Sequence, residues 1–145
     1  MSPAPSRSPL NRFAKTALWL NLVLSFGALG GGAALMIGPR GEVIPLPLSN
    51  LGGSPFDTYF VPGLILFGVL GLGPLVAARL VWLGHPLAPL ATCAVGVALL
   101  VWLAVEIAII GFSVDPPLQP LYLILGVAIL AVGLTWLARH DSLPS

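Results

Sequence analysis

Apolar residues dominate four long stretches of the chain, and polar residues are largely confined to the segments around them. The stretches cover about residues 16–37, 60–82, 87–112 and 118–137. Each is close to the ~20 residues that an α-helix needs to span roughly 30 Å of hydrocarbon. Because a bilayer core has no water to satisfy backbone N–H and C=O groups, each stretch must form its hydrogen bonds internally. The pattern predicts an all-α, polytopic membrane protein with four transmembrane helices in an antiparallel bundle.

The composition favours the same class. Of the 145 residues, 57% are hydrophobic and only 8% are charged, and the mean hydropathy is +1.01. Soluble domains carry about 25% charged residues because water must wet their surface. The lipid bilayer is therefore the predicted partner. Nucleic acid is not, since a net charge of +1 provides no basic face for it.

Prolines mark the ends of the predicted helices. Pro39 follows the first stretch, Pro62 lies in the first turn of the second, and residues 85–86 separate the second stretch from the third. A proline in a first turn costs little because the N–H it lacks would have no partner there. Pro74 lies inside the second stretch, next to two glycines. It removes a backbone hydrogen bond, so the sequence predicts a kink at this point.

The basic residues predict the orientation. With four crossings, five of the six Lys and Arg residues fall on one side of the membrane: Arg7, Arg12, Lys15, Arg79 and Arg139. Only Arg40 falls on the other side. Since positive residues near short loops stay cytoplasmic, both termini are predicted to be cytoplasmic. Residues 1–15 and 138–145 are then tails, and residues 38–59 form one long outer loop that is expected to cover helix ends.

A cleaved signal peptide is the competing interpretation of the first stretch. Its basic start and its small residues at 30–34 would permit cleavage. The stretch is, however, longer than the apolar region of about 7–15 residues that a signal peptide has. Cleavage would also undo the agreement between the charges and four crossings, so a retained helix is the preferred prediction.

Three segments resemble a known group of proteins. They read SPFDTYFVPGLILFGVLGLGPLVAA at residues 54–78, WLAVEIAIIG at 102–111 and LQPLYLILGVAIL at 118–130. Together they resemble small bacterial four-helix integral membrane proteins that are described only as uncharacterised. The resemblance implies a bacterial inner-membrane location and four helices. It implies no activity, because no role comes with that group.

Glu106 is the most informative side chain, because it lies inside the third predicted helix. About five residues separate it from the outer end, which places it roughly 7–8 Å below the interface at 1.5 Å per residue. The predicted site contains Glu106, Trp102, Gln119, Tyr122 and Arg40, with Gln119 and Tyr122 as hydrogen-bonding partners and Arg40 as a counter-ion. An acid at that depth usually faces the bundle interior or a wet cavity. It either forms a protonatable site for a ligand or ion, or it is a structural acid that joins the third helix to the fourth.

Other chemistry-bearing residues predict no catalytic, cofactor or metal site. Cys93 is the only cysteine, which excludes an intrachain disulfide and the CxxC pair of quinone-linked four-helix oxidoreductases. Two histidines, His85 and His140, do not make a metal site by themselves, and Asp141 beside His140 lies in the C-terminal tail. No Ser/His/Asp arrangement is apparent.

Small and polar residues recur on one face of the first predicted helix, at Asn21, Ser25, Ala28 and Gly32. Such residues let helices approach closely and hydrogen-bond across the contact. The stripe therefore predicts a packing seam, either within the chain or in a homo-oligomer.

Two functions remain as hypotheses, and neither is an enzyme, since clustered catalytic groups are missing. The first is a non-enzymatic binding protein or a subunit of a membrane partner. The alternative is a small proton-coupled transporter that uses Glu106. Four-helix multidrug exporters share the size, but their essential acid lies in the first helix, which has none here.

Overall fold

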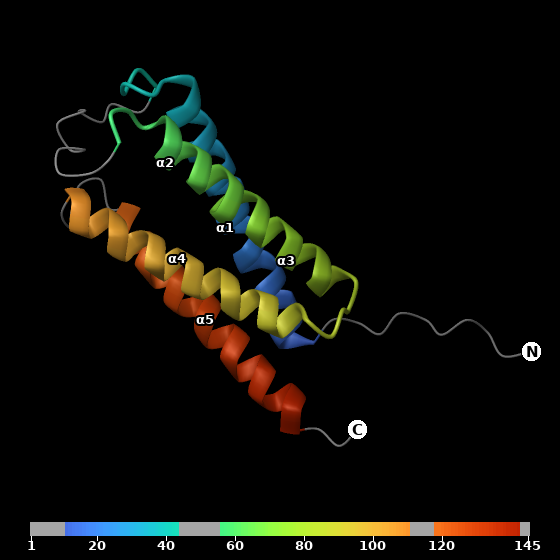
Figure 1. The fold of residues 1–145 in the computed structure, drawn as a ribbon. Coiled ribbons are helices and arrows are strands. Elements are labelled where there is room, and N and C mark those ends of the chain that lie inside the picture. Colours follow the sequence, from blue (N-terminus) through green and yellow to red (C-terminus); the bar gives the residue numbers. More distant parts are fainter. Residues whose placement is uncertain (1–10, 44–55, 111–117, 143–145) are drawn as a thin grey trace, which may run out of the picture.

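The computed structural model describes residues 11–43, 56–110 and 118–142, and the regular structure in these residues is helical. Its elements are α1 (Arg12–Ile37), α2 (Phe60–Ile65), η2 (Leu66–Leu72), α3 (Gly73–Trp82), α4 (Ala88–Ile110) and α5 (Leu118–Ser142). α2, η2 and α3 follow one another without a break and form one long helix (Figure 1). Counting that helix once, the described residues contain four helices long and apolar enough to cross a membrane. The fold is that of a multi-pass helical membrane protein.

The first and last helices extend beyond the apolar stretches that predicted them. α1 begins at Arg12 because Asn11 caps it: the Asn11 side-chain oxygen accepts a hydrogen bond from the Ala14 N–H at 2.7 Å. α5 continues to Ser142 and so includes Arg139. Most of the predicted outer loop (44–55), the turn at 111–117 and the chain ends at 1–10 and 143–145 lie outside the described residues.

The helices pack as two pairs. α1 lies along α2, η2 and α3, while α4 lies along α5. The pairs meet where α1 begins and α5 ends, which we call the terminal end, and they separate toward the distal end, where α1 ends and α2 begins (Figure 1). α3 contacts α4, whereas α2 contacts neither α4 nor α5 in the described part of the chain. The bundle is therefore closed at the terminal end and parted at the distal end.

The predicted seam on α1 is confirmed as a buried helix contact. Asn21, Ser25, Ala28 and Gly32 are all buried. A Cβ placed on Gly32 would lie 2.7 Å from the Gly63 carbonyl oxygen, so the two backbones touch only because Gly32 has no side chain. This contact holds α1 tightly against the second membrane-spanning helix.

The interruption predicted at Pro74 takes the form of a π-helical segment. η2 ends directly before α3, and Pro74 lies in the first turn of α3. A π segment opens the helix where proline would otherwise clash with a preceding carbonyl. The Ser25 hydroxyl donates a hydrogen bond to the Gly71 carbonyl at 2.6 Å, which stabilises the opened turn from the neighbouring helix.

Polar contacts join the two pairs in the interior. The Asn21 amide nitrogen donates to the Ala17 carbonyl at 2.9 Å and to the Thr92 hydroxyl oxygen at 3.4 Å. Both Asn21 and Thr92 are fully buried. Small residues beside them, among them Ala17 and Ala88, pack into an apolar cluster with Val81. This close packing closes the bundle at its terminal end.

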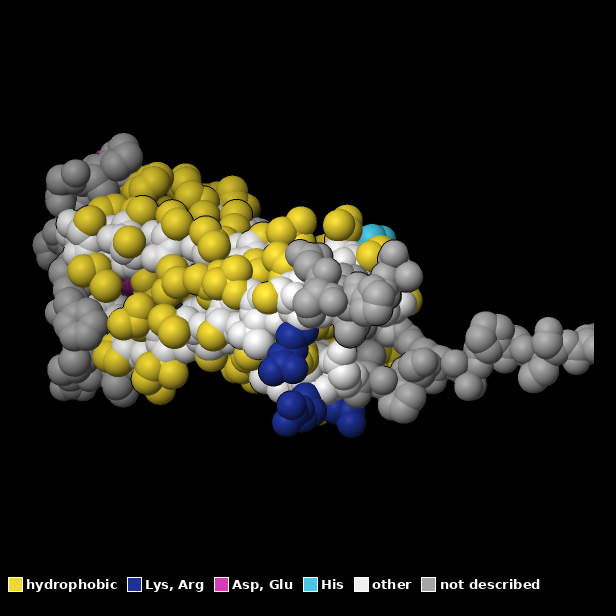
Figure 2. Space-filling model, turned by 90° about the horizontal axis from the view of Figure 1, so that it is seen from below, with side chains coloured by type: hydrophobic (Ala, Val, Ile, Leu, Met, Phe, Trp, Pro, Cys, Tyr) yellow, Lys and Arg dark blue, Asp and Glu magenta, His cyan; other side chains and the backbone are white. Residues whose placement is uncertain are grey.

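The outer surface matches a lipid environment. Apolar side chains cover most of the face seen in Figure 2, and Lys and Arg side chains gather near the terminal end. Large apolar residues such as Phe26 and Trp19 are about two-thirds exposed, at 70% and 67%. Exposure of this kind is stable only where hydrocarbon replaces water around the helices.

Candidate functional site

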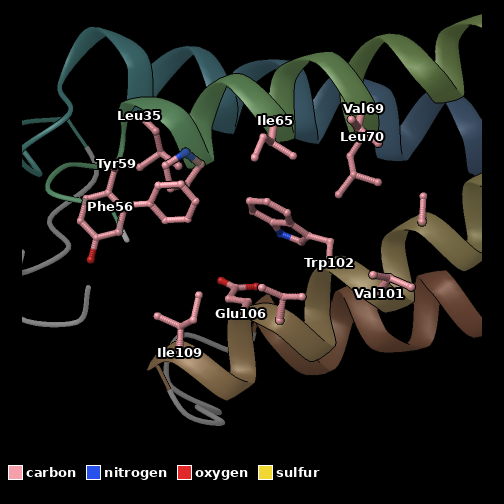
Figure 3. Close-up of a pocket in the computed structure, with 13 residues that line it drawn as sticks. Leu35, Phe56, Tyr59, Ile65, Val69, Leu70, Val101, Trp102, Glu106 and Ile109 are labelled. Atoms are coloured by element: carbon pink, nitrogen blue, oxygen red, sulfur yellow. The ribbon is translucent and has the colours of Figure 1, made fainter. Parts of the chain in front are cut away.

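The separation of the two helix pairs leaves a cavity between α2–η2 and α4. Its volume is about 470 Å³. Its wall consists of Leu35, Phe56, Tyr59, Pro62, Ile65, Val69, Leu70, Ala98, Val101, Trp102, Val105, Glu106 and Ile109. Figure 3 shows Ile65, Val69 and Leu70 on one side, with Trp102 and Glu106 across from them.

Helical periodicity explains why α4 supplies one wall. Its six lining residues lie at positions 98, 101, 102, 105, 106 and 109. Spacings of three and four residues place side chains on a single helix face. The opposite wall follows the same spacing through Pro62, Ile65 and Val69. The cavity is therefore formed by two facing helix surfaces.

Aromatic side chains close the distal part of the cavity. The Tyr59 N–H donates to the Pro39 carbonyl at 2.8 Å, which ties the start of α2 to the end of α1. Tyr59 is buried against Leu35, and Phe56 packs beside them. In Figure 3 the rings of Phe56 and Tyr59 lie across the cavity from Glu106.

Glu106 is the one acidic residue of the cavity wall. Its carboxylate points into the cavity from α4 (Figure 3), and the side chain is half-buried. Within the described ranges, no hydrogen bond or ion pair to this carboxylate is found. An ionised carboxylate beside hydrocarbon is costly unless a cation or hydrogen-bond donor compensates for the lost water. The cavity thus combines an apolar wall with one strong, unsatisfied acceptor.

The structure brings some of the predicted site residues together and keeps others apart. Glu106 and Trp102 both line the cavity. Tyr122 does not, although it is close enough to Glu106 for an electrostatic interaction. Its hydroxyl would lie 2.7 Å from a Cβ on Gly27, so it belongs to the contact between α5 and α1.

Gln119 and Arg40 are not among the residues of the cavity wall. Gln119 is buried at the start of α5, with 6% of its surface exposed. Arg40 is exposed, and its backbone N–H donates to a Glu42 carboxylate oxygen at 3.5 Å. The ion pair predicted between Arg40 and Glu106 is not present among the described residues. That Gln119 and Arg40 belong to the site therefore stays a prediction.

The opposite wall of the cavity has no distinctive pattern in the sequence. Ile65, Val69 and Leu70 are ordinary apolar residues of a membrane helix, and the sequence does not distinguish a cavity wall from a lipid-facing surface. Phe56 and Tyr59 could be expected near a membrane interface, since aromatic residues gather there. They line a cavity only because the two helix pairs separate at this end.

Side chains that could bind a metal do not cluster in the described part of the chain. No group of three or more His, Cys, Asp and Glu side chains is found in the ranges that the structure describes. Cys93 is buried, and its sulfur would lie 2.8 Å from a Cβ on Gly133 of α5. Its environment is therefore a helix contact, remote from Glu106. The arrangement is suited to binding through shape, apolar contact and one charge.

The fold and cavity together define a class, a multi-pass helical membrane protein with an apolar, acid-bearing cavity. No protein-family model matches the chain, and the searches of curated proteins and of solved structures also give no match. The resemblance to small bacterial four-helix membrane proteins therefore stays a prediction.

Proposed function

We propose that this chain is a non-enzymatic membrane protein that binds a small, mostly apolar molecule in the cavity between α2–η2 and α4. The observation that carries the proposal is the cavity, whose volume is about 470 Å³. Sites for small molecules commonly measure about 300–1,000 Å³, and they are mostly apolar with a few placed polar groups. Trp102 and Glu106 provide the polar atoms from α4.

The ligand enters from the bilayer. Four residues of the cavity wall are also exposed on the outer surface of the helices: Ile65, Val69, Val101 and Val105. A cavity whose rim faces outward within membrane-spanning helices opens sideways to hydrocarbon. A lipid-soluble molecule reaches it by lateral diffusion, without passing through water.

The proposed setting is a bacterial cytoplasmic membrane, crossed by an antiparallel four-helix bundle with both termini in the cytoplasm. The support is the charge distribution: Arg12, Lys15, Arg79 and Arg139 belong to the terminal end, and Arg40 to the distal end. By the positive-inside rule the terminal end is cytoplasmic. The cavity and the loop 38–59 then lie in the outer half of the membrane.

Quenching of Trp102 fluorescence tests the binding proposal. A protein that keeps Trp102 as its only tryptophan is made with Trp19→Phe, Trp82→Phe and Trp136→Phe and placed in zwitterionic nanodiscs. Bromo-octanol, a neutral apolar quencher, should quench Trp102 saturably. In a protein with Trp19 as the only tryptophan, quenching should follow simple partitioning, because Trp19 is 67% exposed on the surface of α1.

Two substitutions on α4 provide the matched comparison. Ala98→Phe places a ring in the cavity wall, whereas Ala104→Phe places the same ring on the exposed surface of the same helix. We expect Ala98→Phe to remove the saturable component and Ala104→Phe to preserve it. Val69→Phe, from the opposite wall, should repeat the effect of Ala98→Phe. The proposal would be refuted if the quenching of Trp102 did not saturate and if none of these substitutions changed it.

Glu106, which has no partner among the described residues, lies across the cavity from an interrupted helix, and this favours a second candidate, a small proton-coupled transporter that uses Glu106. A carboxylate in a cavity can exchange a proton for a substrate, and Pro74 and η2 give the neighbouring helix a point of bending. In liposomes, Glu106→Gln should abolish pH-dependent flux. A proton-coupled flux that this variant leaves unchanged would rule the transporter out.

A further inference from the structure

We infer that the molecule bound in this cavity is a lipophilic cation, held with its charged group at Glu106 and its apolar part against Leu70 and Ala98. The inference rests on the proposed binding function and specifies the chemical class of its ligand. Three features carry it: the charge of the wall, the position of the aromatic rings, and the direction in which polarity changes along the cavity.

The charge of the cavity wall is negative, and no cation among the residues that the structure describes pairs with it. Glu106 is the one charged residue of the wall. The described cations lie elsewhere: Arg12, Lys15, Arg79 and Arg139 toward the terminal end, and Arg40 exposed near the end of α1. A neutral ligand leaves the charge of the carboxylate uncompensated even where it donates a hydrogen bond to it, and an anionic ligand would be repelled. A cationic ligand supplies the missing charge.

Aromatic rings surround the space in front of the carboxylate. Trp102 lies one helical turn before Glu106 on α4, and the rings of Phe56 and Tyr59 lie across the gap (Figure 3). Aromatic faces attract cations, most strongly when the pair is shielded from water. A substituted ammonium group fits this environment better than a strongly hydrated cation because its apolar substituents can contact the rings.

Polarity changes along the cavity in the direction that an amphiphile requires. Glu106, Tyr59 and Phe56 belong to its distal part, while Val69, Leu70 and Val101 continue it toward the middle of the bundle (Figure 3). Ala98 also lines the cavity and lies one helical turn before Val101 and Trp102 on α4. A bound amphiphile would therefore place its charge near the membrane interface and its chain toward the bilayer centre. This is the orientation that it already has in the lipid leaflet, so entry requires no inversion.

A pair of probes with equal chains tests the charge preference. The quenchers are bromo-octyltrimethylammonium, whose charge is independent of pH, and neutral bromo-octanol, both titrated into the protein with Trp102 as its only tryptophan. We expect Glu106→Gln to weaken saturable binding of the ammonium probe about tenfold and to leave the alcohol unchanged. Phe56→Leu should weaken the ammonium probe by a smaller factor. Glu42→Gln, the same change at an exposed acid away from the wall, is the matched control.

The outcomes separate this inference from the binding proposal on which it rests. If both probes bind saturably but Glu106→Gln leaves the ratio of their affinities unchanged, the cavity binds apolar molecules and the cation assignment is wrong. If neither probe binds saturably, the binding proposal itself is wrong. A loss of ammonium binding in Glu42→Gln equal to that in Glu106→Gln would assign the effect to general surface charge and would also overturn the inference.

Discussion

At the scale of single residues, the side chain with the largest physical consequence is Glu106. Its carboxylate faces an apolar cavity and has no hydrogen bond or ion pair among the described residues. A group in this situation lowers the stability of the empty protein because it has lost water without gaining a partner. Proteins commonly retain such destabilising groups where function requires them.

The substitution Glu106→Leu should therefore raise the stability of the ligand-free protein. We expect the free energy of unfolding to increase by about 1 kcal/mol, since the half-buried carboxylate no longer needs compensation. Thermal unfolding followed by circular dichroism in detergent measures the change, with Glu42→Leu at an exposed position as the control. A clear loss of stability in Glu106→Leu alone would favour the structural interpretation, in which the acid joins α4 to α5.

At the scale of elements, glycines decide how closely the helices approach. Gly32 touches the backbone of Gly63 and Phe67 on the neighbouring helix, whereas a Cβ on Gly30 would meet nothing within 4 Å. The two glycines occupy the same helix and differ only in the face on which they lie. Their comparison isolates the effect of packing from the effect of glycine on the helix backbone.

Gly32→Ala should destabilise the protein, and Gly30→Ala should not. The added methyl group at position 32 would lie 2.7 Å from backbone atoms that cannot move aside, so α1 and the second helix must separate. Overpacking of this kind costs typically about 1–3 kcal/mol. At position 30, alanine should be neutral or slightly stabilising. Equal unfolding temperatures for the two variants would contradict the close contact.

At the scale of the whole molecule, the two helix pairs are joined at one end and parted at the other. The terminal end is closed by small residues and by the contact between Asn21 and Thr92. At the distal end α2 does not reach α4 in the described residues, and the cavity occupies the space between them. The parted end lies toward one side of the membrane, so the orientation of the chain decides which leaflet would supply the proposed ligand.

Labelling with a membrane-impermeant maleimide checks the orientation. In a Cys93→Ala background, cysteines are introduced at Glu42, toward the distal end, and at His85, between α3 and α4; both positions are exposed. We expect Glu42→Cys to react in intact cells and His85→Cys to react only after lysis. The reverse pattern would place the termini outside and the cavity in the inner leaflet.

The four membrane-spanning helices and the seam on α1 could be predicted from the sequence because both depend on local properties of the chain. Twenty apolar residues span a bilayer whatever lies beside them, and a stripe such as Ser25 and Gly32 repeats on one helix face by periodicity alone. An acid is rare in a membrane helix, so the sequence drew attention to Glu106 and to its neighbour Trp102, and both line the cavity. It did not identify Val69 or Leu70, because cavity-facing and lipid-facing residues are equally apolar.

The sequence by itself determined that the chain is made of four apolar helices and that one acid lies within the third. These are consequences of length, hydropathy and the cost of an unsatisfied backbone in hydrocarbon. Only the tertiary structure decided that the helix pairs separate at the distal end, that Glu106 faces the resulting cavity, and that Arg40 is not part of its wall. These features depend on packing between residues far apart in the chain, and hydropathy does not encode such packing.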